Sequence, residues 1–494
     1  MTRSHRLRTV VLMLTTAALL LTGMPAATAE DDPKPGSAAY LLRDLRNVTD
    51  AYGRITGPGG QLANPNYLPA LVRETTLLTA TQLLAQAATP TRLALSAGLL
   101  VPGWNVGNPL RAGWNGTRGL SKKVSFVNRY GALLRGTVYA PKPGAKDPYT
   151  GATLQGPFPG VVITPGSVQG SEGMYVWLAQ DLAERGYVVL TYDVQGQGTS
   201  ETLPHTTGSE LPFCNPFAAP VDGNLLGCPG VPFQQLANFT TGTLDALDFF
   251  LSEANPYLPS VDRSPDPDSV TSGRTGRVAI IGHSLGAAAV SHVQGSDERV
   301  SAVVALDKLQ GPSDTSALNA LSPADDITPV VPALAVQSEY GFTVSPAQLS
   351  GGNTLLPAPG LPVPTRERAT GYDDWLAAGK DAMLVVPRAS THLEYTDIPY
   401  VLPASRYGQA LTSVYVQAFL DRYLKHRGTD ASLVGSTLRY LEPRGKGVWT
   451  PLTLDRDANL SFYYCSAYSI HSGTSADGPV LADADVAGVG GCDD

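Results

Sequence analysis

Short apolar runs alternate with helical patterns along the middle of the chain. Two alternating runs of apolar and polar residues flank residues 128–131 and predict a β-hairpin from Lys123 to Pro141. The runs that predict buried strands lie at residues 160–164, 187–193, 278–281, 300–307, 331–337 and 382–387. Patterns typical of helices lie at residues 175–185, 236–250 and 406–425. This order predicts an α/β fold with a mostly parallel sheet flanked by helices.

The pattern divides the chain into a main domain and two extensions. We expect the main domain at residues 119–428, with a Pro/Gly-rich insertion at 202–232 that forms a loop or lid over the site. Residues 30–118 form an N-terminal extension with a helix from Ala70 to Ala88, which we expect to pack against the main domain. Residues 429–494 form a C-terminal extension. The residues there that suggest short strands are Leu452, Leu454 and the run 460–464.

The first 29 residues have the pattern of a secretory signal. Basic residues at Arg3, Arg6 and Arg8 precede an apolar run from Val10 to Leu21, and Ala27-Thr28-Ala29 fits a cleavage site. The apolar run is too short for a comfortable membrane span. We therefore expect an extracellular protein that is cleaved after Ala29 and has no stable insertion in a membrane.

The net charge of the chain argues against some classes of binding partner. The formal charge of −8 becomes −11 when the three arginines of the signal are removed with no acidic residue. An acidic secreted chain without a basic cluster argues against nucleic acid or an anionic membrane as partner.

Four cysteines follow the signal, and their even number in an oxidising compartment predicts two disulfides. Three pairings are possible. We favour the local pairing Cys214–Cys228 and Cys465–Cys492, which closes short loops in Gly/Pro-rich segments. No Cys-Xaa-Xaa-Cys or histidine cluster accompanies them, so we expect no metal site.

The main candidate for chemistry is the stretch from Gly282 to Gly286, with sequence Gly-His-Ser-Leu-Gly. It lies between the apolar run Val278–Ile281 and the small residues Ala287–Val290, which are typical of a strand and a close-packed helix. This context is that of a nucleophile elbow, a strained turn that exposes its serine. We predict Ser284 as the nucleophile and the N–H of Leu285 as one donor to a substrate oxyanion.

A histidine and an acid should follow the serine along the chain. His392 lies directly after the last predicted strand, where its imidazole can take the proton of Ser284. Asp307 and Glu339 each end a strand after the elbow, and either carboxylate could orient the imidazole. Asp381 and Glu394 are close to His392 in sequence but are interpreted as surface charges.

Several of these motifs resemble the α/β-hydrolase superfamily across about residues 120–427. They are the hairpin, the elbow, the glycine-rich turn after Asp193 and the late histidine. Three details resemble the platelet-activating-factor acetylhydrolase branch and related secreted bacterial esterases. They are Ala305-Leu306-Asp307 placed 23 residues after Ser284, the segment Ser338-Glu339-Tyr340, and the small-residue loop before His392. The resemblance implies an α/β-hydrolase fold, with Asp307 as the acid of the triad and Glu339 as a structural residue.

A second oxyanion donor should come from the loop after the first central strand. By position this loop is Pro165-Gly166-Ser167-Val168, in which the N–H of Ser167 is the first candidate and that of Val168 the second.

These residues together predict a secreted serine hydrolase that cleaves carboxylic esters, an esterase or lipase-like enzyme. Its reaction would need no cofactor or metal, and its substrate would be an ester of a small molecule, a lipid or a polymer. A peptidase or amidase on the same fold is one alternative, although the sequence shows no propeller or large helical cap. A non-catalytic binding protein is the other, against which the intact set of Ser284, Asp307 and His392 argues.

Overall fold

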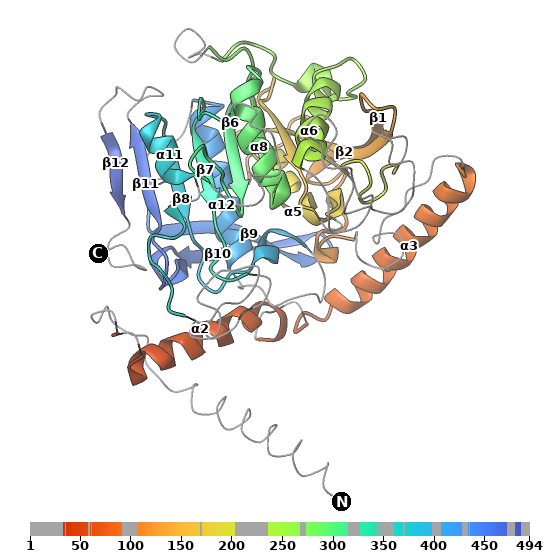
Figure 1. Cartoon of the computed structure of the whole chain (residues 1–494). Helices are drawn as coiled ribbons and strands as arrows, with labels where there is room; N and C mark the ends of the chain where they lie inside the picture. The colour runs from red at the N-terminus through yellow and green to blue at the C-terminus, as the bar shows by residue number, and fades with distance from the viewer. Residues whose placement is uncertain are drawn as a thin grey trace, which may run out of the picture. The chain divides into compact units, whose positions relative to one another are not determined.

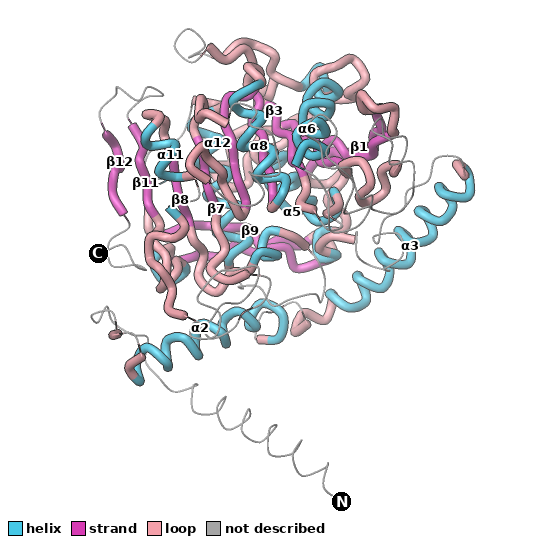
Figure 2. The backbone as a smooth tube through the Cα atoms, in the orientation of Figure 1, coloured by secondary structure: helices cyan, strands magenta, loops and turns pink. Residues whose placement is uncertain are grey.

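A mixed β-sheet is the centre of the described part of the chain. In the computed structural model, ten strands of the described residues join in the order β1-β2-β4-β3-β5-β6-β7-β8-β11-β12 (Figures 1 and 2). By residue contacts the chain divides into two compact units, Met1–Arg43 and Asp44–Asp494, and the sheet belongs to the second. The structure describes residues 33–34, 36–57, 60, 62–90, 106–167, 170–202, 236–266, 273–314, 327–341, 344, 360–368, 371–397, 407–426, 433, 435–471 and 480–485.

The middle of the sheet is parallel, from β4 through β3, β5, β6 and β7 to β8. Its strands are β3 (Gly160–Thr164), β4 (Val188–Tyr192), β5 (Val278–His283), β6 (Val300–Leu306), β7 (Ala333–Val336) and β8 (Ala382–Val385). Every residue of these strands is buried, as continuous apolar runs require in a sheet covered on both faces. The prediction of a mostly parallel α/β sheet is therefore confirmed.

Antiparallel strands complete both sides of the sheet. The predicted hairpin is β1 (Gly119–Val127) and β2 (Leu133–Pro141), and β2 pairs with β4. At the other side β11 (Ala467–His471) pairs with β8, and β12 (Val480–Asp485) pairs with β11. Part of the predicted C-terminal extension thus continues the central sheet, a pairing that the sequence pattern did not predict.

Helices cover the two faces of the sheet. The helices within the described residues are α2 (Ala38–Thr56), α3 (Tyr67–Ala88), α5 (Val176–Glu184), α6 (Leu236–Phe250), α8 (Leu285–Ser296), α11 (Tyr372–Ala377) and α12 (Gly408–Tyr423). Helices α6 and α8 lie in front of the sheet in Figure 1, and α12 lies behind it. The flanked sheet and the three helices predicted in the main domain are confirmed, whereas α2 was not predicted.

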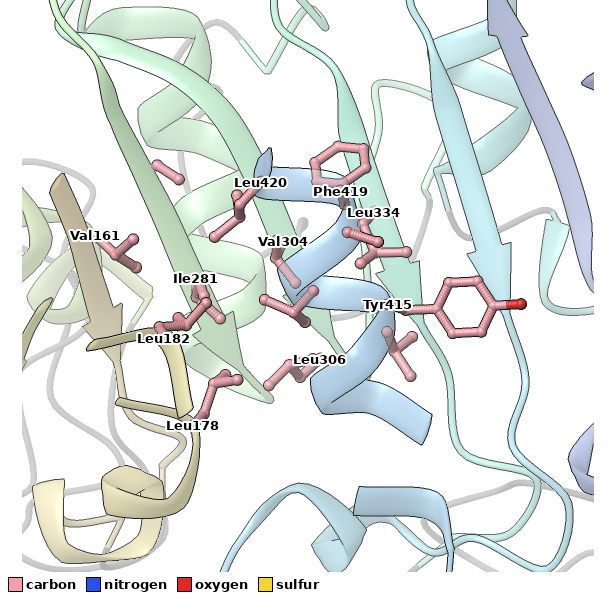
Figure 3. Packing of buried hydrophobic residues seen from close by; sticks show 14 of the residues in the cluster. Val161, Leu178, Leu182, Ile281, Val304, Leu306, Leu334, Tyr415, Phe419 and Leu420 are labelled. Atoms are coloured by element: carbon pink, nitrogen blue, oxygen red, sulfur yellow. The ribbon is translucent and has the colours of Figure 1, made fainter. Parts of the chain in front are cut away.

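The largest described core cluster lies between the sheet and helices α5 and α12. In Figure 3, helix α12, with Phe419 and Leu420, lies over the strand that carries Val304, and Leu182 of α5 lies beside Ile281. All five side chains are fully buried. Burial of each contributes roughly 1.5–3 kcal/mol to folding, so this layer fixes α5 and α12 on one face of the sheet.

The N-terminal helix α3 packs only in part. Tyr67 and Leu71 at its start form a small buried cluster with Leu110. Gln82 further along the helix is also buried, whereas its neighbours Leu83 and Leu84 are 63% and 71% exposed. The helix is therefore buried at only a few positions, and its cluster with Leu110 lies within the N-terminal extension itself. Among the described residues, no helix is both long enough and apolar enough to cross a membrane.

The strand prediction for the C-terminal extension is correct in one place and wrong in another. Leu452 and Leu454 lie in β10 (Val448–Asp455), which pairs with β9 (Thr437–Gly445). The run 460–464 is not a strand, because the hydroxyl of Ser461 accepts hydrogen bonds from the backbone N–H groups of Tyr463 and Tyr464 and bends the chain.

A buried ion pair connects segments that are distant in sequence. Arg111, before β1, donates to Asp181 of α5 at 2.8 Å and to the hydroxyl of Tyr440 of β9 at 2.7 Å. Asp181 also accepts the hydroxyl of Ser413 of α12 at 2.7 Å. Both charged side chains are nearly inaccessible to water, so each depends on the other for its compensating charge.

We predict that Arg111→Met destabilises the protein by about 3–5 kcal/mol, because it leaves the carboxylate of Asp181 buried without a cation. Urea unfolding measures the change in the free energy of unfolding. The double variant Arg111→Met/Asp181→Leu is the control. It should regain part of the loss, since no charge then remains buried. An Arg111→Met variant as stable as the wild type contradicts the prediction.

Candidate active site

Ser284 occupies the turn between β5 and α8. Its backbone has φ 56° and ψ −122°, a strained conformation for a residue with a side chain. The N–H of Ser284 donates to the carbonyl of Leu306 at 2.9 Å, which ties the turn to the end of β6. Ser284 is partly exposed, although His283 and Leu285 beside it are buried. The predicted strand, strained serine and helix are thus present in the backbone.

Glycines on both sides of Ser284 are required by close backbone approach. A Cβ on Gly282 would lie 2.1 Å from the carbonyl oxygen of Gly286, and one on Gly286 would lie 2.4 Å from that of Pro165. Neither position has room for a methyl group. The first turn of α8 therefore packs directly on the chain that leaves β3, as the glycine spacing predicted.

Asp307 and His392 form a close buried pair. Nδ1 of His392 lies 2.6 Å from Oδ2 of Asp307, and the two side chains are 10% and 7% exposed. Asp307 directly follows β6, and His392 begins a short 3₁₀ turn after β8. The carbonyl of Gly341 accepts the backbone N–H of His392 at 2.9 Å, so the residue is fixed at its main chain as well.

The environment of Asp307 favours its ionised form. Burial alone would raise its pKa, but the hydrogen bond and the charge of His392, together with the donors of Ser338, lower the pKa to about 2. Ser338 donates its hydroxyl to Asp307 at 2.5 Å and its backbone N–H at 3.2 Å. Asp307 is therefore a fixed negative charge at neutral pH, directed at one nitrogen of the imidazole.

Strand register brings these residues to one edge of the sheet. His283 of β5 is paired with Leu306 of β6, so Ser284 and Asp307 are the next residues of two neighbouring parallel strands. The ring of His283 lies 4.8 Å from that of His392, which places the histidine segment over the serine turn. The structure thus gathers Ser284, Asp307 and His392, three residues that the sequence spreads over more than a hundred positions.

The loop after β3 lies beside Ser284. A Cβ on Gly166 would be 3.1 Å from Cβ of Ser284, so Ser167 is close to the turn. The N–H of Gly166 is taken by the hydroxyl of Tyr175 at 2.9 Å, which leaves Ser167 as the described candidate donor in this loop. Val168 lies outside the described residues. Leu285 is the first residue of α8, and backbone N–H groups at that end of a helix lack partners within the helix.

The carboxylate of Glu339 has a different set of partners from that of Asp307, and His392 is not among its described hydrogen-bond donors. Its carboxylate accepts hydrogen bonds from the side chains of Asn47 and Ser461 and from the backbone N–H of Ala389 at 2.6 Å. Burial raises the pKa of Glu339 to about 6, against the opposite effect of these donors. Of the two acids proposed from the sequence, Asp307 contacts His392. Glu339 instead joins the N- and C-terminal extensions to the loop that leads to His392.

Asp381 and Glu394 are not the surface charges that the sequence suggested. Asp381 is 5% exposed and accepts the hydroxyl of Tyr423 at 2.6 Å. Glu394 is fully buried and accepts the backbone N–H of Gln409 in the first turn of α12. Helix α12 supplies a donor to each of these buried carboxylates, a contact that local sequence does not reveal.

Ser338 and Tyr175 contact the residues of this site, although the sequence pattern did not predict them. The available signal for Ser338 was a hydroxyl side chain just after β7, the strand that pairs with β6, and Asp307 directly follows β6. Tyr175 has no comparable signal, because its hydroxyl reaches His283, 108 positions away, through the folded core.

Some predictions fall on residues that the structure does not describe. The proposed signal at 1–29 and most of the insertion at 202–232, with Cys214 and Cys228, lie outside the described residues. Cys492 does too. Cys465, the described cysteine, is buried and is not a free thiol. Because its expected partner Cys492 is not described, the pairing remains a prediction.

Comparison with known proteins finds a partial match. No protein-family model matches the chain. A stretch of 125 residues is 34% identical to an uncharacterized protein of Pseudomonas aeruginosa. The match covers 24% of this chain and 31% of that protein, so it spans less than a third of the relative.

The raised pKa of Glu339 predicts a pH-dependent stability. A carboxyl group whose pKa rises from 4.5 in the unfolded chain to about 6 in the folded protein stabilises the fold when protonated. This contribution is present below about pH 4.5 and is lost as the pH rises through 6. The substitution Glu339→Gln removes this pH-dependent contribution, because the amide does not titrate. We expect the free energy of unfolding of the wild type, relative to Glu339→Gln, to be about 2 kcal/mol higher at pH 4 than at pH 7.

Urea unfolding of both proteins at the two pH values measures this difference. Subtracting the variant from the wild type removes the contribution of the other titrating groups. A difference that is the same at pH 4 and pH 7 would show that Glu339 titrates normally in the folded protein.

Proposed function

We propose that this chain is a serine hydrolase that cleaves carboxylic esters and has the α/β-hydrolase fold. The observation that carries the proposal is the 2.6 Å pair of His392 and Asp307 beside the strained, partly exposed Ser284. The chain order serine, aspartate, histidine is that of α/β-hydrolases, and it supports the resemblance found in the sequence. An aspartate that is already ionised and aimed at a histidine is what base catalysis by that histidine requires.

In the first half of the reaction, Oγ of Ser284 attacks the ester carbonyl carbon while Nε2 of His392 takes the hydroxyl proton. The carbonyl oxygen becomes an oxyanion, which the N–H groups of Leu285 and Ser167 stabilise. The bond to the alcohol oxygen then breaks, and His392 gives its proton to the departing alcohol. The acyl group remains on Ser284 as an ester.

In the second half, water attacks the acyl group and gives a proton to His392. The bond to Oγ breaks, Ser284 regains its proton, and the carboxylic acid leaves. Asp307 stabilises the imidazolium in both halves and stays ionised itself, in accord with its lowered pKa. All groups in this scheme belong to the chain, so we propose no cofactor and no metal.

The substrate proposed is an ester of a small molecule, a lipid or a polymer outside the cell. Export is part of the proposal and rests on the residues of the amino-terminal pattern.

We predict that the exported protein begins at Glu30, because Ala27-Thr28-Ala29 fits a signal-peptidase site. Expression of the full chain in a secreting bacterial host, followed by mass spectrometry of the medium, measures the mature N-terminus. A chain that stays in the cell with residues 1–29 attached contradicts the proposed export.

We predict that p-nitrophenyl esters of graded acyl length are hydrolysed by the mature protein. Ser284→Ala should reduce kcat by at least about 10⁴-fold, because no nucleophile remains, and Asp307→Asn by on the order of 10³–10⁴-fold, because the imidazole loses its orienting charge. Glu339→Gln should stay within about tenfold of the wild type, since its contacts do not include His392. Initial rates at saturating ester give kcat for each protein.

Two comparisons separate the alternatives. Faster cleavage of aminoacyl anilides than of esters would replace the esterase proposal by an amidase. Failure of the mature wild type both to cleave any ester and to react with a fluorophosphonate probe would favour a binding role for the fold.

A further inference from the structure

A continuous chain of hydrogen bonds joins the proposed oxyanion loop to the main chain of His392. The N–H of Gly166 donates to the hydroxyl oxygen of Tyr175 at 2.9 Å, and this hydroxyl lies 2.8 Å from Nδ1 of His283. Nε2 of His283 lies 2.8 Å from the carbonyl oxygen of His392. Tyr175 and His283 are 1% and 2% exposed, so water does not compete for these groups.

The partners fix the direction of every bond. The carbonyl oxygen of His392 can only accept, so Nε2 of His283 carries the hydrogen. Nδ1 of the neutral ring is then an acceptor, and the hydroxyl of Tyr175 donates to it. Burial, together with the neighbouring His392, lowers the pKa of His283 to about 3, so the ring stays neutral at physiological pH. Each donor in the chain therefore has one acceptor.

The series of hydrogen bonds contacts all three segments that the proposed reaction needs. Gly166 belongs to the loop of Ser167, His283 precedes Ser284 in the turn, and the last acceptor belongs to His392 itself. Parts of the sequence more than two hundred residues apart are connected through two side chains. Neither Tyr175 nor His283 has a place in the chemical steps proposed above.

Gly166 is held from a second side as well. Its carbonyl oxygen accepts Nε2 of Gln197 at 3.0 Å, so the peptide groups on both sides of this residue are fixed. A Cβ on Gly166 would lie 3.0 Å from Nδ1 of His283, which shows how closely the loop rests on that ring. The adjoining N–H of Ser167 thereby receives a defined position relative to Ser284.

We propose that Tyr175 and His283 are positioning residues, which hold the oxyanion loop and the main chain of His392 in register with Ser284. The inference rests on the proposed esterase function. Acyl transfer requires the nucleophile, base and oxyanion donors to be placed within about 0.5 Å, and an error of 1 Å can cost on the order of 100-fold in rate. A bridge of buried, directed hydrogen bonds provides such placement without touching the substrate.

The first test removes one hydroxyl. Tyr175→Phe keeps the ring but breaks the chain at both of its bonds. Tyr415→Phe is the matched control, because its buried hydroxyl bonds to Tyr468 at 2.7 Å in the layer between α12 and β11, away from the site. We expect Tyr175→Phe to lower kcat for p-nitrophenyl esters on the order of 10- to 100-fold with KM within about threefold. The control should keep wild-type kcat at a similar loss of Tm.

The second test separates hydrogen bonding from packing at His283. In His283→Gln the amide oxygen can accept from Tyr175 and the amide N–H can donate to the carbonyl of His392. His283→Leu has a side chain of similar size and neither group. We expect His283→Gln to retain kcat within about tenfold of the wild type and His283→Leu to lose on the order of 100-fold. A residue that only fills space would favour leucine, since an apolar side chain is easier to bury.

The outcomes distinguish the inference from the proposed function. If the wild type is active and Tyr175→Phe retains its kcat, or His283→Leu equals His283→Gln, the positioning role is wrong and the esterase proposal stands. A change in KM alone also overturns it, because it would indicate substrate binding. If the wild type and Ser284→Ala are equally inactive, the esterase proposal fails, and the positioning role with it.

Discussion

The strained backbone of Ser284 is the constraint on which the other features of the site depend. A side chain at positive φ persists only where the surrounding structure determines it, and here that structure is the parallel core of the sheet. Gly286 lets α8 approach the chain leaving β3 so closely that a methyl group would collide with the carbonyl of Pro165. The hydrogen bond from Ser284 to Leu306 secures the other side of the turn. Strain at one residue is thus held by three parallel strands.

The pKa values of two buried carboxyl groups near this edge are shifted in opposite directions. Asp307 faces an imidazole and two donors of Ser338, and these lower its pKa to about 2 although burial opposes the shift. Glu339 meets only neutral donors, and burial prevails, with a pKa of about 6. A carboxylate that orients a catalytic histidine has to remain charged, whereas one that holds segments together does not. This difference in pKa supports the proposed roles, with Asp307 as the acid that orients His392 and Glu339 as a structural residue.

The features that sequence could predict are those with a local cause. Strand β3 at Gly160–Thr164 was predicted to the residue because a strand buried on both faces is a continuous apolar run. The group of Ser284, Asp307 and His392 could be predicted because each residue follows a parallel strand, directly or in the next loop, and parallel strands bring these loops to one edge. The pairing of β11 with β8 and the burial of Glu394 were missed, since both are set by contacts between distant segments. Tyr175 belongs to this second class.

The extensions then have a physical connection to the site that their sequences did not suggest. Asn47 of α2 and Ser461 of the C-terminal extension both donate to Glu339, which in turn accepts the N–H of Ala389. Ala389 has φ 59°, and it lies three residues before His392. A residue with a side chain at positive φ needs support from its surroundings, and here that support comes through Glu339 from both extensions. The geometry of the histidine segment is thus a property of the whole fold of residues 44–494, and the extensions are part of the framework that sets it.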